Sequence, residues 1–155
     1  MKKLLLICSH VAALAIGFGL GVYFLPILTA PEAVKAEALK SLVGQAAFSA
    51  KFRKDLKGSD FLHWGEGTLS IGPKAIALQG RVSPGPDYKL YLAPEYVEDK
   101  EGFLRVKGRS VRLGDVKTFE NFIVPVPGSV DIGRYTAVVL WCETFSMFIS
   151  AAKYR

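Results

Sequence analysis

The stretch YTAVVLWCETFSMFISAAK, residues 135–153, decides the fold class of this 155-residue chain. Between residues 135 and 141 nearly every side chain is β-branched, aliphatic or aromatic, and the whole stretch lacks Gly and Pro. This composition predicts one long strand, or two strands that meet near Glu143. In an extended chain Cys142 points to one face and Trp141 to the other. Both faces are largely apolar, so we expect a strand in the interior of a sheet that is covered on two sides.

Short segments of alternating apolar and polar residues fill most of the chain before this stretch. They lie at residues 48–53, 68–71, 75–79, 88–92, 103–107, 111–116 and 119–126, with Gly or Pro in many of the turns between them. About eight or nine short strands of this kind predict an all-β fold, an antiparallel sandwich or barrel. Nothing after Gly44 has the pattern of a long amphipathic helix, which disfavours a helical bundle and a doubly wound α/β enzyme. We therefore expect one β domain over residues 46–155.

Residues 1–30 predict a transmembrane helix. Residues 4–28 contain no Asp, Glu, Lys or Arg, and at about 1.5 Å per helical residue they exceed a hydrocarbon core of about 30 Å. Lys2 and Lys3 come before this segment, which predicts a cytoplasmic N-terminus and a periplasmic or extracellular domain. A cleavable signal peptide is the alternative. Its apolar part is normally shorter, and Leu28 stands where a cut after Ala30 requires a small residue, so we expect an uncleaved signal anchor.

Residues 31–45 predict a helical linker between the anchor and the domain. Thr29 and Glu32 have the spacing of a capping box, and Gly44 is placed to end the helix. The apolar stripe of this helix consists of Val34, Ala38, Leu39 and Leu42. We expect the stripe to dock on the domain or to lie at the membrane surface.

Composition and motifs restrict the function and the partners. The net charge of +6 is scattered along the chain, and an exported domain has no access to nucleic acid, so the membrane is the expected partner. Gly17 and Gly21 match the small-xxx-small pattern of a helix-packing face, which is compatible with a homodimer. The sequence contains no phosphate loop, nucleophile elbow, zinc-protease motif or covalent-haem motif. Since His63 is the one histidine of the exported part, a catalytic triad or a metal site is disfavoured, and we do not expect an enzyme.

Five segments stand in an order that is typical of one family. They are HWGEGTLSI (63–71), SPGPDYKLYLAP (83–94), RLGDVK (112–117), IVPVP (123–127) and YTAVVLWCETFSMFISAA (135–152). Together they resemble the DM-thirteen domain family, also called the electron-transfer DM domain, over residues 48–154. GPDYKLYL and WCETF are the most specific pieces. The stretch FENFIV departs from the family's Gly-x-Gln-x-Tyr character, so no role is transferred to Asn121 or Phe122.

The resemblance implies an extracytoplasmic all-β module that takes part in electron transfer with a redox protein partner. It makes Cys142 the candidate redox thiol or prosthetic-group ligand, with haem as a possible cofactor. His63 is a candidate second ligand, although a structural histidine at the edge of a strand is the alternative. The remaining motif positions are expected to have structural roles, in a turn (Gly85, Pro86, Asp87), in strand packing (Tyr88) and in the core (Trp141).

Cys142 itself leaves two interpretations open. Small exported domains normally pair their cysteines, yet Cys8 is expected in the membrane and leaves Cys142 without a partner. An odd thiol of this kind is a candidate for reaction or ligation. Free cysteine is also among the most buried residue types and packs as a small hydrophobe. The first interpretation predicts a membrane-anchored redox accessory, and the second a non-catalytic binding or structural module.

Overall fold

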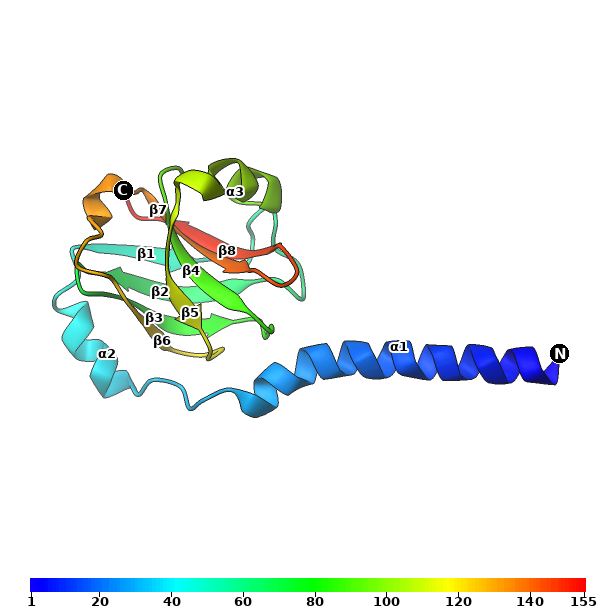
Figure 1. Cartoon of the computed structure of the whole chain (residues 1–155). Helices are drawn as coiled ribbons and strands as arrows, with labels where there is room; N and C mark the ends of the chain where they lie inside the picture. The colour runs from blue at the N-terminus through cyan, green and yellow to red at the C-terminus, as the bar shows by residue number, and fades with distance from the viewer.

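Two four-stranded antiparallel sheets face each other in the computed structural model, which describes the backbone of residues 1–155 and every side chain except that of Ala36 (Figure 1). The first sheet has the order β1-β2-β3-β6 and consists of β1 (Phe48–Phe52), β2 (Gly65–Ile71), β3 (Ala75–Val82) and β6 (Phe122–Pro125). The second has the order β5-β4-β7-β8 and consists of β4 (Tyr88–Ala93), β5 (Val111–Val116), β7 (Ala137–Cys142) and β8 (Met147–Lys153). The prediction of an antiparallel, sandwich-like all-β domain is confirmed.

The stretch that predicted the fold forms the two strands β7 and β8, joined by a turn that begins at Glu143. All six residues of β7 are buried, and the strand lies between β4 and β8 inside its sheet. Its side chains alternate between two separate cores, as the sequence predicted. Leu140 and Cys142 belong to the core between the sheets, whereas Val139 and Trp141 belong to a second core on the outer face.

A short helix, α3 (Lys100–Val106), covers that outer face (Figure 1). The prediction of a strand at residues 103–107 is therefore wrong. The Asp99 side chain caps the helix by accepting a 2.8 Å hydrogen bond from the Gly102 backbone N–H, which satisfies one of the donors that every helix start leaves free. Phe103 and Val106, three residues apart on one helical face, are fully buried in the second core. A short 3₁₀ turn, η1 (Lys107–Arg109), continues α3, and a second one, η2 (Ile132–Arg134), precedes β7.

The chain reaches the domain through two helices. The first, α1 (Lys2–Thr29), is long and apolar enough to cross a membrane by length and composition, has no buried residue and contains Pro26. It extends away from the domain on the side where the β7–β8 turn lies (Figure 1). The second, α2 (Ala36–Val43), packs against β3 and buries Leu39, so the expected docking on the domain is the alternative that is found.

The predicted capping box at the start of the linker helix is wrong. Thr29 belongs to α1, where its hydroxyl donates a 2.8 Å hydrogen bond to the Leu25 carbonyl. The helix α2 starts later, after Lys35, which offers no side-chain cap. Pro31 explains the gap, because a proline disfavours helical backbone at the residue before it and has no N–H to continue α1.

Candidate functional site

An apolar pocket of about 380 Å³ lies between one end of the β domain and α1. Its walls come from α1, from the loop between β1 and β2, from the turn before β4 and from the β7–β8 hairpin. The lining residues are Gly19, Val22, Tyr23, Leu62, His63, Pro84, Gly85, Pro86, Tyr88, Cys142, Phe145, Met147 and Ile149. The pocket thus brings together Cys142 and His63, the two candidate ligands from the sequence, although they are far apart along the chain.

Cys142 is the last residue of β7 and is only 3% exposed. Burial raises the pKa of its thiol above the ordinary 9.0, although backbone hydrogen bonds from Phe145, Asp87 and Thr144 partly offset this effect. The thiol therefore stays protonated at neutral pH. Since the thiolate is the form that reacts with disulfides, Cys142 has little intrinsic reactivity unless a neighbouring cation stabilises its charge.

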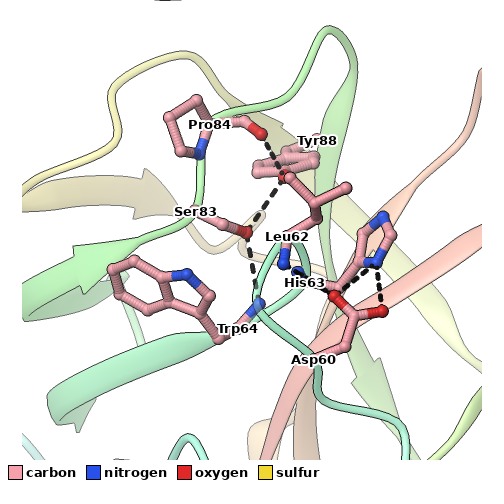
Figure 2. Close-up of polar contacts among 7 residues, drawn as sticks. All are labelled: Asp60, Leu62, His63, Trp64, Ser83, Pro84 and Tyr88. Carbon is pink, nitrogen blue, oxygen red and sulfur yellow. Dashed lines mark hydrogen bonds and ion pairs between the residues drawn. The ribbon is translucent and has the colours of Figure 1, made fainter. Parts of the chain in front are cut away.

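His63 is held in a defined orientation by Asp60 (Figure 2). Its Nδ1 lies 2.9 Å from Oδ2 and 3.0 Å from Oδ1 of Asp60, and Oδ1 also accepts hydrogen bonds from the backbone N–H groups of Leu62 and His63. Partial burial alone raises the pKa of Asp60, but the hydrogen bonds from His63 and these two amides outweigh it and lower the pKa. In a neutral imidazole this carboxylate favours the tautomer with the proton on Nδ1, which leaves the lone pair on Nε2. Metal-binding histidines are oriented by carboxylates in this way.

Tyr88 links this loop to the turn before β4 (Figure 2). Its hydroxyl donates to the Pro84 carbonyl at 3.1 Å and lies 3.4 Å from the Ser83 hydroxyl oxygen, which accepts a 3.2 Å hydrogen bond from the Trp64 backbone N–H. Burial raises the pKa of Tyr88 well above its ordinary value of 10.0, so the phenol remains neutral. The motif tyrosine therefore positions the wall of the pocket and carries no charge into it.

The two most specific sequence motifs pair with each other in the sheet. Tyr88 lies directly opposite Cys142 in the β4–β7 ladder. Just beyond it, the Asp87 carbonyl accepts a 3.0 Å hydrogen bond from the Glu143 N–H, and its carboxylate accepts one of 3.2 Å from the Thr144 hydroxyl. Glycine at residue 85 avoids a clash, because a Cβ would lie 2.4 Å from the hydroxyl oxygen of the buried Tyr88. GPDY and WCET thus form a single structural unit around the thiol.

Trp141 faces away from this pocket, into the second core. Its ring centroid lies 4.9 Å from that of Phe103 and 5.2 Å from the Lys107 ammonium. That ammonium is 2.6 Å from one oxygen of Glu143, whose other oxygen accepts a hydrogen bond from the Tyr91 hydroxyl. The buried indole N–H of Trp141 has no hydrogen bond of good geometry to any described residue.

Burial and hydrogen bonding both shift pKa values in the polar cluster formed by Glu143, Lys107 and Tyr91. Partial burial alone raises the pKa of Glu143, yet the hydrogen bonds from Lys107 and Tyr91 reverse the direction and lower it. The pKa of Tyr91 rises well above 10.0 through burial and its contact with Glu143. Sequence reasoning missed Lys107 because it comes from a segment predicted as a strand. For Glu143, the one indication in the sequence was its place in the WCET motif, where a carboxylate directly follows a buried strand.

The described side chains contain no group of three or more His, Cys, Asp or Glu that could hold a metal ion. A prosthetic group in the pocket therefore has His63 and Cys142 as its only protein ligands from these residue types. His63 fits this role because the Asp60 contact at Nδ1 leaves Nε2 as the nitrogen that could bind a metal. Cys142 fits it only if the bound metal takes the place of the thiol proton, as coordinating metals do.

Fold and site together define a small β-sandwich module with a buried thiol next to an apolar pocket. A model of the family described as Electron transfer DM13 matches residues 47–154, well over half of the chain. The protein belongs to this family, and the resemblance found in the sequence is confirmed. Neither the curated proteins nor the solved structures gave a match.

Proposed function

We propose that this protein is a membrane-anchored redox accessory whose redox centre occupies the pocket lined by Cys142 and His63. Membership of an electron-transfer family supports a redox role in general. The observation that supports the centre's location is that both candidate ligands line one apolar pocket. Its volume of about 380 Å³ falls within the range of about 300–1,000 Å³ that is usual for ligand and cofactor sites.

Ligation explains the pocket better than thiol–disulfide chemistry does. Cys142 is almost fully buried, its pKa is raised, and the other cysteine, Cys8, lies in α1. A disulfide needs a second thiol within about 7 Å between the Cα atoms, and the domain contains none among its described residues. A bound haem or metal centre would supply reversible one-electron chemistry. The protein would supply the neutral Nε2 of His63, the sulfur of Cys142 and walls that exclude water.

The surrounding residues have clear tasks in this proposal. Asp60 holds the imidazole in one tautomer by accepting the Nδ1 proton. Tyr88 and Asp87 fix the β7–β8 hairpin that carries Cys142. The apolar lining lowers the local dielectric, which strengthens the influence of each nearby charge on a redox potential.

A non-catalytic binding module is the second candidate. The position of Cys142 in the core between the sheets favours it, because a thiol with 3% exposure packs there as well as any small apolar side chain. In that case the pocket binds an apolar ligand, and the sulfur of Cys142 neither reacts nor coordinates a metal.

The absorbance spectrum of the full-length protein, purified in detergent, separates the two candidates. A redox centre gives a visible or near-ultraviolet band that shifts in Cys142→Ser and in His63→Gln and is unchanged in Cys8→Ser, the matched control. A colourless protein that remains so after incubation with haemin and with transition-metal ions would rule out the ligation proposal and leave the binding module.

The membrane anchoring and the extracytoplasmic side are part of the same proposal. They rest on the apolar α1 and on the lysines that precede it. The homodimer through Gly17 and Gly21 also stays a prediction. A Cβ added at either glycine would meet no described atom within 4 Å, so both positions have room for the close approach of a second helix.

A further inference from the structure

Exposed apolar side chains gather at one end of the β domain. Apart from α1 and the Met1 that precedes it, the exposed large hydrophobic residues among the described side chains are Val43, Phe61, Leu62, Leu104 and Phe145. Leu62 and Phe145 line the mouth of the pocket, and Phe61 precedes Leu62 in the same loop. Phe61 is 86% exposed. This exposed phenyl ring at the tip of a loop, together with two further apolar side chains, forms an apolar patch of the kind that marks an interaction surface.

The helix α1 fixes the depth at which these side chains lie. Leu62 and Phe145 line the same pocket as Gly19, Val22 and Tyr23 of α1. Starting at the first apolar residue after Lys3, a hydrocarbon core of about 30 Å takes up about 20 residues at about 1.5 Å each, and so ends near Tyr23. Tyrosine is a typical residue for this boundary. The mouth of the pocket therefore lies level with the outermost turn of the membrane-spanning segment.

We propose that the rim formed by Phe61, Leu62 and Phe145 inserts into the outer leaflet of the bilayer that α1 crosses, so that the pocket opens toward lipid. Gly19 lies about four residues, or about 6 Å, below the boundary, which matches the usual burial of an interfacial apolar face by about 5–10 Å. The proposal rests on the part of the proposed function that keeps α1 attached and in the membrane. It does not depend on whether Cys142 has redox chemistry.

The occupant of this surface is bilayer lipid. A second copy of the chain is the other partner to consider, but α1 lines the same pocket as Leu62 and Phe145 and brings lipid to the rim wherever the helix is inserted. A ligand that enters between α1 and the domain then comes from the membrane phase. This arrangement selects apolar, membrane-dissolved molecules over water-soluble ones.

The test uses the full-length protein in phosphatidylcholine vesicles whose acyl chains carry bromine, a quencher of indole fluorescence. Phe145→Trp places an indole on the rim. Leu104→Trp is the matched control, because Leu104 has the same exposure of 49% but lies on α3, at the outer face of the domain. The native Trp64 and Trp141 are present in both variants and in the unsubstituted protein, which provides the baseline. Phe61→Trp repeats the rim measurement at a side chain without packing to disturb.

We expect the added indole of Phe145→Trp and of Phe61→Trp to lose most of its emission in brominated vesicles, and that of Leu104→Trp to keep its emission. Equal emission from rim and control indoles, in protein that floats with the vesicles, would overturn the insertion of the rim and leave the anchor intact. Protein that does not float with the vesicles would overturn the anchor and the rim together. Bromine-dependent quenching that is equal at all three positions would place Leu104 on α3 in lipid as well, and would refute an orientation in which the rim alone inserts.

Discussion

Cys142 illustrates how burial controls the chemistry of a single residue. Its pKa lies above the ordinary 9.0 because the folded domain removes the sulfur from water. We expect the alkylation rate of Cys142, measured in a Cys8→Ser protein without bound groups, to rise with an apparent pKa above 9.0. In denaturant the pKa should return to its ordinary range and the reaction should become fast. An apparent pKa below 9.0 in the native protein would contradict the effect of burial and would mean that a nearby cation stabilises the thiolate.

Glu143 is a residue whose loss should cost measurable polar stabilisation. Glu143→Gln leaves the partly buried Lys107 without its carboxylate partner, and a buried group without its partner costs about 1–3 kcal/mol. Glu95→Gln is the matched control, since Glu95 pairs with Arg109 at an exposed site, where ion pairs contribute about 0–1 kcal/mol. Urea denaturation of both variants measures the difference. Equal losses in the two variants would contradict a stabilising role for the Glu143 cluster.

The same residue predicts a pH dependence. Because the folded protein lowers the pKa of Glu143 below its ordinary 4.5, the stabilisation is complete above about pH 4.5 and is lost as the pH falls through the folded-state pKa. The free energy of unfolding of the unsubstituted protein should therefore decrease more steeply below pH 4.5 than that of Glu143→Gln. Parallel curves for the two proteins in this range would show that Glu143 does not contribute.

At the scale of elements, the turn before β4 depends on the absence of a side chain at residue 85. Gly85→Ala puts a methyl group against the ring of Tyr88, whose hydroxyl oxygen is 2.4 Å from the ideal Cβ position. Overpacking of this kind costs about 1–3 kcal/mol. Gly128→Ala is the control, because a Cβ there meets no described atom within 4 Å. Thermal unfolding should show a lower midpoint for Gly85→Ala alone, and similar midpoints for both variants would contradict the contact.

The strands could be predicted well because their patterns are strictly local. The two faces of β7 follow from a period of two, so Cys142 and Trp141 were assigned correctly to different cores. The segment 103–107 was assigned wrongly because a helix as short as α3 has too few turns to show its own period. Its decisive feature is Asp99, a capping residue that lies before the segment. The capping box at Thr29 failed for the opposite reason, since α1 continues through that residue.

The site was predictable only in part. Sequence reasoning selected Cys142 and His63, and the structure places both on one pocket. It could not find Asp60 as the partner of His63, because a carboxylate three residues away becomes a partner only through the shape of the loop. Nor could it join Lys107 to Glu143, since their contact depends on how α3 lies across the sheet.

At the scale of the whole molecule, the proposed anchoring by α1 would determine where the domain works. If α1 is an uncleaved anchor, the full-length chain should stay in the membrane fraction after alkaline carbonate extraction and should keep the electrophoretic size of the complete sequence. The physical reason is that its apolar span is longer than a signal peptide requires. Replacing both Leu28 and Pro31 by Ala creates a small-x-small site with no proline after the cut, and serves as the control that should be cut. A soluble, shortened wild-type protein would disprove the anchor.

The position of β7 between β4 and β8 also matters for chains whose synthesis is incomplete. Synthesis delivers β4 and β5 long before β7 and β8, so during that interval β4 presents an open row of backbone donors and acceptors. In a truncated chain this edge of β4 stays unpaired, so it can form strand-to-strand hydrogen bonds with other copies of the chain. Premature termination upstream of Ala137 should therefore produce aggregates, and proteolysis would then decide how much of the truncated chain remains.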